Sequence, residues 1–405
     1  MRVMHLIFGL CLMLASLTVV AQEDPESTEV PLPPIEITIW WPDVIAHDGQ
    51  GTINPLLIEQ TDAFANQMPE VTFEHRLKAV GTTGGIMSTL RTANRAATGA
   101  LPSLTLVRRN DLVTLQNLTY IQELEGISST IIGDLDTALA LGQIDTALYG
   151  LPYMLDVQHT VYRPTEDVSY DNWTFDAVLA RNEPFIFPAG RANGINDVLL
   201  LQYIQAGGLA TDNLIVAEEG LQSIFSFYEA ATDAELITGL AVNATTYSWY
   251  REDFLAGAYQ SGVFNSTSYL DMYAEDSSLQ VAPIPTADGE TVAFMEGWMW
   301  VMIAQDTEER RVATEYLNWM LSTERQSLLA QDIHMLPSRA NARAFGLAND
   351  VPSDTYDELL ENALIPVPDT AIGALGRAIQ ANFASILTLE NSAEDSLEAI
   401  LEFAD

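Results

Sequence analysis

The amino-acid sequence predicts an α/β fold, on three observations. The chain has 405 residues, of which 48% are hydrophobic and 18% charged, so it can bury a large core. Its length indicates two to three domains, because a single core stops growing beyond about 250–300 residues. The first segments alternate strand-like and helix-like patterns, which is typical of parallel strands joined by helical crossovers.

The segment at 35–41 predicts the first strand, because isoleucines alternate there with Glu36 and Thr38 before two tryptophans. A helical stripe of apolar residues follows at 53–68 and ends at a Met-Pro pair. The same patterns predict strands at 71–76 and 103–107 and helices at 84–97 and 111–118.

The later part of the chain repeats this style. Strand-like runs alternate with helical stripes, and Asp306 with Glu309 forms an N-cap pair before one of the helices. The expected strands are 185–188, 281–285 and 293–303, and the expected helices are 198–206, 219–231, 308–321 and 323–331.

Composition and charge exclude several classes of protein. The chain carries 56 acidic and 17 basic residues and a formal net charge of −39, so its surface repels nucleic-acid phosphates and disfavours anionic lipid. The single cysteine excludes a disulfide framework, and the 5 histidines show no metal-binding spacing. We therefore expect a protein that binds no nucleic acid, no metal and no cofactor. We also expect it to be a monomer.

The N-terminus predicts export. A positive charge precedes an apolar run at 6–20, and small residues fit a cleavage site after Ala21. Residues 1–21 are therefore expected to be a signal peptide, and the acidic, Pro-rich residues 22–34 a spacer. The alternatives are an uncleaved anchor helix and lipidation of Cys11, which lies within the apolar run instead of after it. We expect the protein in the periplasm or outside the cell, associated with the cell envelope.

Nine short motifs follow one another along the chain. They are ITIWW at 37–41, LPSLTLVRRNDL at 101–112, the stretch at 118–124, YGLPYMLDVQHTVYR at 149–163, NWTFDAVLA at 172–180, FLAGAYQSGVFNSTSYL at 254–270, VAPIP at 281–285, EGWMWVMI at 296–303 and LPSRANA at 336–342. In this order they resemble the family 1 extracellular solute-binding proteins of ABC importers, which include maltose-binding protein. The likeness covers about residues 35–405.

The resemblance implies a two-lobed, periplasmic-binding-protein-like α/β fold with a hinged cleft between the lobes. It places lobe 1 at 35–150 plus 282–325 and lobe 2 at 151–281 plus 326–405. It also implies a binding protein that captures a small solute, above all a sugar or oligosaccharide, in the cleft. Such a protein delivers its solute to the transmembrane subunits of an ABC permease.

Eight residues are candidates for ligand binding. Ligands bind beyond the carboxyl ends of parallel strands, so residues after the first and third strands are among them. The others come from motifs of the resemblance. The candidates are Trp41, Asp43, Arg109, Asn110, Asp156, Tyr269, Glu296 and Trp298.

The resemblance gives some of these residues a role. Asp156 matches an acidic hinge position that would accept ligand hydroxyls, and its alternative is a helix cap or a surface carboxylate. Trp298 matches a frequent aromatic position of the family, and its alternative is the core. Ser268 stands where the family often has a stacking tryptophan, so Tyr269 is expected to substitute for it. Trp41 either stacks on the ligand or belongs to the core, since it and the tryptophan before it point to opposite sides of the strand.

Two adjacent arginines, Arg108 and Arg109, are unusual in so acidic a chain. They form either a clamp for an anionic ligand or ion pairs with the chain's own carboxylates. Asp111, at the same turn, is expected to cap the helix that follows.

Two other functions stay open from sequence. No nucleophile or metal motif supports a secreted hydrolase, but the many acidic residues leave room for a carboxylate pair at glycosidase spacing. A ligand sensor for a membrane receptor would use the same cleft. The leading expectation is a binding protein that is not an enzyme.

Overall fold

The computed structural model describes residues 34–81, 83–165, 173–210, 213–347, 351 and 353–404. The predicted signal peptide, and all of the predicted spacer except Pro34, lie outside these described residues. In the part of the chain that the structure describes, no helix combines the length and the apolar character needed to cross a membrane.

The predicted alternation of strands and helices is confirmed in the first part of the chain. β1 (Ile35–Pro42) lies between β2 (Val71–Lys78) and β3 (Leu104–Val107) and is parallel to both. Both faces of β1 are covered, because Trp40 and Trp41 point to opposite sides and are both buried. This is the arrangement expected of a parallel sheet with helices on both faces.

Helices connect these strands as predicted. They are α2 (Pro55–Ala65), α3 (Ile86–Ala96) and α4 (Arg109–Asn117). The expectation that Asp111 caps α4 is wrong, because the helix begins two residues earlier, with Arg108 at the N-cap position. Asp111 lies instead in the first turn, where a carboxylate interacts favourably with the helix dipole.

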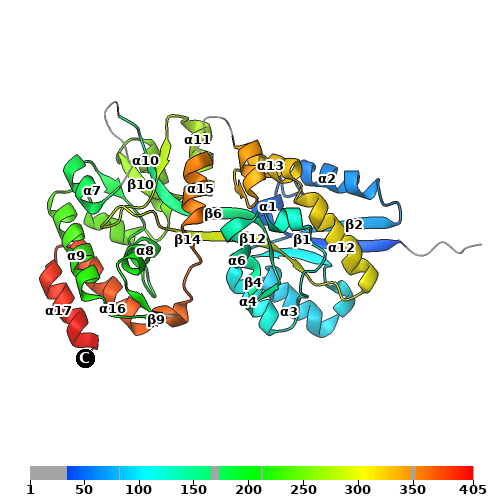
Figure 1. The fold of residues 1–405 in the computed structure, drawn as a ribbon, viewed down its shortest axis with the longest axis horizontal. Helices are drawn as coiled ribbons and strands as arrows, with labels where there is room; N and C mark the ends of the chain where they lie inside the picture. The colour runs from blue at the N-terminus through cyan, green and yellow to red at the C-terminus, as the bar shows by residue number, and fades with distance from the viewer. Residues whose placement is uncertain are drawn as a thin grey trace, which may run out of the picture. The chain divides into compact units, whose positions relative to one another are not determined.

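The sheet continues beyond β3 with two long strands, β12 (Ala293–Met302) and β6 (Leu151–Tyr162). Among the described residues the main sheet has ten strands, in the order β2-β1-β3-β12-β6-β10-β7, with β11 and β13 paired to β6 and β14 paired to β12. β12 runs antiparallel to β3 on one side and to β6 on the other. Figure 1 shows β6 and β12 side by side in the middle of the molecule.

β6 changes neighbours along its length. Its first half pairs with β12, and residues 158–162 pair with β10 (Ser261–Asn265). Part of that second half also pairs with β11 (Gln280–Ala282). The sequence did not predict this strand, because its motif was interpreted only as a hinge segment.

The predicted helices of the later part are present with shifted ends. They are α8 (Asp197–Gln205), α9 (Glu218–Asp233), α12 (Thr307–Met320) and α13 (Thr323–Asp332). α7 (Phe175–Arg181) lies in the motif at 172–180, which resembles a helix start of the family. The longer elements not predicted from sequence are α11 (Ser266–Glu275), α14 (Ala340–Gly346), α15 (Ser353–Glu361), α16 (Asp369–Leu387) and α17 (Ala393–Ala404). The shorter elements are α1 (Asp43–Ala46), α5 (Ser129–Ile132), α6 (Leu139–Gly142), α10 (Arg251–Leu255), β4 (Gln143–Ile144), β5 (Ala147–Leu148), β7 (Phe185–Ile186), β8 (Leu209–Ala210), β9 (Asn213–Leu214), β13 (Leu336–Pro337) and β14 (Ala363–Leu364).

The N-cap predicted for α12 is confirmed. The Asp306 carboxylate accepts the backbone N–H groups of Glu308 and Glu309 at 2.9 and 3.0 Å. The Glu309 side chain does not complete a reciprocal capping box. It accepts the hydroxyl of Ser103, and so ties the start of α12 to the start of β3.

The helices form two groups. α16 and α17 pack on α9, whereas α12 and α13 pack on α2. The Asn54 amide at the start of α2 donates to the Asp332 carboxylate at the end of α13 at 2.6 Å. The lobe boundaries drawn from sequence stay a prediction.

A buried ion pair fixes the start of α14. Arg339 Nε donates to Asp134 Oδ2 at 2.8 Å, and the two side chains are 5% and 10% exposed. The other Asp134 oxygen accepts the backbone N–H of Asn341 at 3.1 Å. Removing one partner would leave the other charge buried and unpaired.

We expect Asp134→Ala to lower the free energy of unfolding by about 3–5 kcal/mol, measured by urea denaturation. The matched control is Glu252→Ala, which breaks an exposed pair with Arg251 and should cost about 0–1 kcal/mol. Equal losses in the two variants would contradict a stabilising role for the buried pair.

His159 of β6 is fully buried. Its Nε2 lies 3.2 Å from the Tyr356 hydroxyl, and its Nδ1 lies 3.2 Å from the Thr160 carbonyl. Burial lowers the pKa of His159 from 6.5 to about 4, so the folded protein keeps this ring neutral.

The unfolded chain binds a proton at His159 below about pH 6.5, whereas the folded chain does so only near pH 4. Stability is therefore lost as the pH falls through this window, by about 2–3 kcal/mol for this group. We expect His159→Gln to show a smaller drop in unfolding free energy between pH 7 and pH 4.5 than the wild type. The exposed His47→Gln variant is the control and should keep the full drop.

Candidate functional site

Three polar side chains interrupt the buried faces of β6 and β12. Glu296 is the exposed residue of β12, and Asp156 and Gln158 are the partly exposed residues of β6. Asp156 lies directly opposite Glu296 in the antiparallel ladder, so both side chains lie on the same face of the sheet. Trp298, two residues after Glu296, belongs to that face as well.

The Asp156 carboxylate sits at the beginning of α11. Its Oδ1 accepts the Ser266 hydroxyl at 2.9 Å, the Thr267 backbone N–H at 3.1 Å and the Thr267 hydroxyl at 3.2 Å. Its Oδ2 accepts the Asn265 side-chain amide. Burial raises the pKa of Asp156, and these hydrogen bonds and the Arg108 charge oppose the rise. Asp156 is therefore held in a fixed orientation, with Oδ2 retaining free acceptor capacity.

Glu296 is paired with an arginine that follows β3. Arg108 Nη1 donates to Glu296 Oε2 at 3.0 Å, and the Arg108 guanidinium lies 5.1 Å from the centre of the Trp298 ring. Burial raises the pKa of Glu296, the charges of Asp156 and Asp197 raise it further, and Arg108 opposes them. These groups are thus close enough to interact electrostatically.

Three residues from other segments complete the group. Gln158 Nε2 donates to Asp197 Oδ2 at 3.4 Å, and Arg191 Nη1 lies 3.9 Å from Asp197 Oδ1. Burial raises the pKa of Tyr247, and the charges of Asp156, Glu296 and Asp197 add to this effect. We call the set the polar cluster, and its members are Arg108, Asp156, Gln158, Arg191, Asp197, Tyr247, Glu296 and Trp298.

The structure brings together three of the eight residues predicted from sequence, namely Asp156, Glu296 and Trp298. Sequence reasoning missed Tyr247, although aromatic residues in a polar loop, TTYSWY at 245–250, were a usable signal. It also missed Gln158 and Asp197, for which the sequence offered no comparable signal.

Trp41 and Tyr269 both lie in the core. For Trp41 this is the core alternative that the sequence left open, whereas Tyr269 was expected to stack on a ligand. Trp41 is 0% exposed, donates from Nε1 to His75 Nδ1 at 2.9 Å and packs edge-on against Trp300. Tyr269 is also 0% exposed, and its hydroxyl donates to the Leu279 carbonyl at 3.2 Å. Neither ring offers an open face, because Trp41 packs against His75 and Trp300, and Tyr269 of α11 packs against His159 and Tyr356.

Two of the remaining candidates, Arg109 and Asp43, serve local structure. Arg109 donates from Nη1 to the backbone carbonyls of Leu141 and Gln143, at 2.9 and 2.5 Å. It therefore holds the end of α6, and its neighbour Arg108 is the arginine that reaches the cluster. Asp43 accepts the backbone N–H of the residue after it in α1, and Asn110 is exposed on α4. In the described ranges, no hydrogen bond or ion pair joins Asp43 or Asn110 to the polar cluster.

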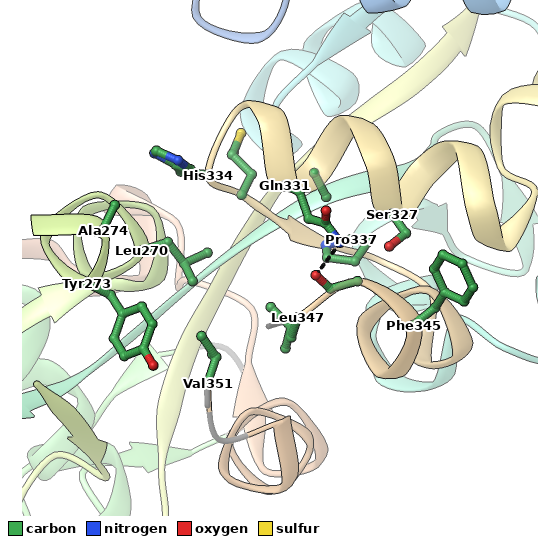
Figure 2. A pocket seen from close by; sticks show the side chains of 13 residues that line it. Leu270, Tyr273, Ala274, Ser327, Gln331, His334, Pro337, Phe345, Leu347 and Val351 are labelled. Carbon is green, nitrogen blue, oxygen red and sulfur yellow. Dashed lines mark hydrogen bonds between the residues drawn. The ribbon is translucent and has the colours of Figure 1, made fainter. Parts of the chain in front are cut away.

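A separate apolar cavity of about 420 Å³ lies between α11 and the α13–α14 pair. Figure 2 shows Leu270 and Tyr273 of α11 facing Leu347 and Val351 across it. Its lining contains no member of the polar cluster. Among the described residues, no group of three or more histidine, cysteine or acidic side chains is arranged to hold a metal ion. The polar cluster, unlike this cavity, offers carboxylate, amide and guanidinium groups to a hydrogen-bonding solute.

Solved structures with the same fold are numerous. The chain is similar to the cyclic α-maltosyl-1,6-maltose binding protein from Arthrobacter globiformis, with a TM-score of 0.68 and 19% identity over 92% of this chain and 98% of that one. A family 1 extracellular solute-binding protein from Bifidobacterium longum subsp. infantis gives a TM-score of 0.65 and 17% identity, over 91% and 98% of the two chains. Maltose-binding protein from Listeria monocytogenes gives 0.65 and 16%, over 91% and 97%. A search of curated proteins gives no match.

These likenesses establish the mixed α/β fold of periplasmic binding proteins, which the sequence predicted. A family model described as bacterial extracellular solute-binding protein matches residues 59–358, more than half of the chain. The family is one of binding proteins and not of enzymes, so the hydrolase alternative is set aside. With this fold and this match, the chain belongs to the bacterial extracellular solute-binding proteins.

Proposed function

We propose that this solute-binding component of an ABC transporter captures a neutral sugar or oligosaccharide at the polar cluster and delivers it to the transmembrane permease subunits. The observation that carries the proposal is the pair Asp156 and Glu296, directly opposite each other on β6 and β12 and beside Trp298. Consistent with an extracellular family, we propose that the protein acts in the periplasm or at the cell surface.

The chemistry of the cluster matches that of a sugar. A sugar ring has a rim of hydroxyl groups and faces of C–H groups. Carboxylates accept hydroxyl hydrogen bonds more strongly than neutral acceptors do, and an indole ring covers a C–H face. Gln158 and Tyr247 add side chains that both donate and accept.

The charge balance of the cluster favours a neutral solute. Its three carboxylates are Asp156, Asp197 and Glu296, and its two arginines are each near one of them. Each arginine would have to break its contact with a carboxylate before it could bind an anionic ligand. The reading of the arginine pair as an anion clamp is less well supported, because Arg108 pairs with Glu296 and Arg109 binds backbone carbonyls.

Several solved relatives also point to saccharides, although each is distant in sequence. One of those proteins binds cyclic α-maltosyl-1,6-maltose, and another was solved with maltotetraose at 15% identity to this chain. These ligands belong to those proteins and support only the class of solute proposed here.

We propose that β6 and β12 act as the hinge between two lobes. Residues of the cluster come from the segment before β6, from the two strands and from the segment between them, so closure would complete the site and exclude water. A solute that contacts both halves stabilises the closed state. We propose the lobe ranges predicted above, with α13 moved to lobe 1 because it packs on α2 and α12.

We expect a neutral mono- or oligosaccharide to raise the melting temperature of the mature chain, residues 22–405. At a concentration 100 times its Kd, the solute adds about 2.7 kcal/mol of stability. The measurement is differential scanning fluorimetry with tryptophan emission, against neutral sugars, uronic acids and sugar phosphates. A response to anionic compounds alone would contradict the neutral-solute proposal, and no response to any sugar would contradict the sugar proposal.

We expect Tyr247→Phe to weaken sugar binding about three- to tenfold, because one hydroxyl hydrogen bond contributes about 0.5–1.5 kcal/mol. The ligand-free melting temperature should hardly change, since only an oxygen is removed. The matched control is Tyr120→Phe, at another half-buried tyrosine outside the cluster. Isothermal titration calorimetry gives both affinities, and equal affinities for Tyr247→Phe and the control would remove Tyr247 from the site.

A further inference from the structure

We propose that Arg108 is an internal competitor of the solute, which holds Glu296 and covers the face of Trp298 until a sugar ring displaces it. This inference rests on the proposed function, because it assigns a specificity-determining role within the same site. Arg108 would then set how strongly neutral solutes are preferred and how tightly they bind.

One guanidinium occupies both places that a sugar ring would use. It lies 5.1 Å from the centre of the Trp298 ring, a cation–π contact, and donates to Glu296 Oε2 at 3.0 Å. A stacked sugar needs the same ring face, and its hydroxyls need the same carboxylate oxygen. The two occupants exclude each other.

The other face of Trp298 offers no alternative. Trp298 is 4% exposed and belongs to the buried cluster that includes Trp300 and Met154. The face beneath Arg108 is therefore the one that can be opened without unpacking the core.

Arg108 can leave at low cost. The side chains of Arg108 and Glu296 are 49% and 51% exposed, and half-exposed ion pairs are weak. Arg109 cannot leave its position as easily, because its guanidinium donates to two backbone carbonyls. A long, half-exposed side chain can swing into water while keeping its charge hydrated.

Whether removing the Arg108 side chain strengthens or weakens sugar binding separates two roles for this residue. If it competes with the solute, its removal frees Trp298 and Glu296 and strengthens neutral-sugar binding. If it donates to the solute, its removal weakens binding. Salt gives a second distinction, because screening weakens the Arg108–Glu296 pair but hardly affects a neutral sugar.

The experiment compares the wild type, Arg108→Ala and Arg311→Ala by isothermal titration calorimetry with the best neutral sugar at low and high salt. Arg311→Ala is a matched control, since this substitution removes one positive charge from exposed ion pairs on α12. We expect Arg108→Ala to bind about three- to tenfold more tightly than both other proteins. We also expect the wild-type affinity to rise with salt and that of Arg108→Ala to stay constant. Weaker or unchanged binding by Arg108→Ala would overturn the proposal.

A second measurement needs no solute and so separates this inference from the proposed function. Removing the guanidinium should expose the Trp298 ring to acrylamide, so Arg108→Ala should show more fluorescence quenching than the wild type. In a Trp298→Phe background the same substitution should change quenching little. An equal change in both backgrounds would show that Arg108 does not cover Trp298 and would overturn the inference. Failure of every sugar to bind, with the quenching result as expected, would instead count against the sugar proposal alone.

Discussion

The rest of the structure depends on the antiparallel pairing of β6 and β12. Both strands are buried along nearly all of their length, so a polar side chain on them loses much of its water. Asp156 and Glu296 lie directly opposite each other on these strands, and both carboxylates lose part of their hydration there. Burial accordingly raises the pKa of both carboxyl groups. Each carboxylate accepts hydrogen bonds from residues of other segments. The partners, in turn, define the candidate site.

Asp156 links the sheet to α11. Asn265 ends β10, caps α11 by accepting the Ser268 N–H at 3.0 Å, and donates its amide to Asp156. The carboxylate therefore contributes to the position of the helix as well as to the cluster. Tyr269 of α11 and His159 of β6 pack together in the core, with ring centres 5.6 Å apart. A rearrangement at Asp156 would therefore also shift the first turn of α11 and the packing of Tyr269 on His159.

Two adjacent arginines at the end of β3 have opposite surroundings. Arg109 is drawn inward by the carbonyls of Leu141 and Gln143, and burial lowers its pKa. Arg108 is half-exposed and reaches across to β12. The strand-to-helix turn sends consecutive side chains in different directions, so one arginine stabilises a loop and the other lies in the site. Charge pairing within the candidate site supports the proposal of a solute that carries hydroxyl groups and no net charge.

The sequence by itself determined the family and many of the local elements, but not β6, α11 or the helices after α13. Alternating isoleucines, helical stripes and the Asp306 cap depend on neighbours along the chain, and the structure contains those elements. The motifs also pointed to Asp156, Glu296 and Trp298, which the structure places together. Only the tertiary structure decided that Trp41 and Tyr269 are core residues, and that Tyr247, Gln158 and Asp197 join the cluster. The physical reason is that strand parity tells which side chains share a face, whereas burial and contact depend on what distant segments pack against that face.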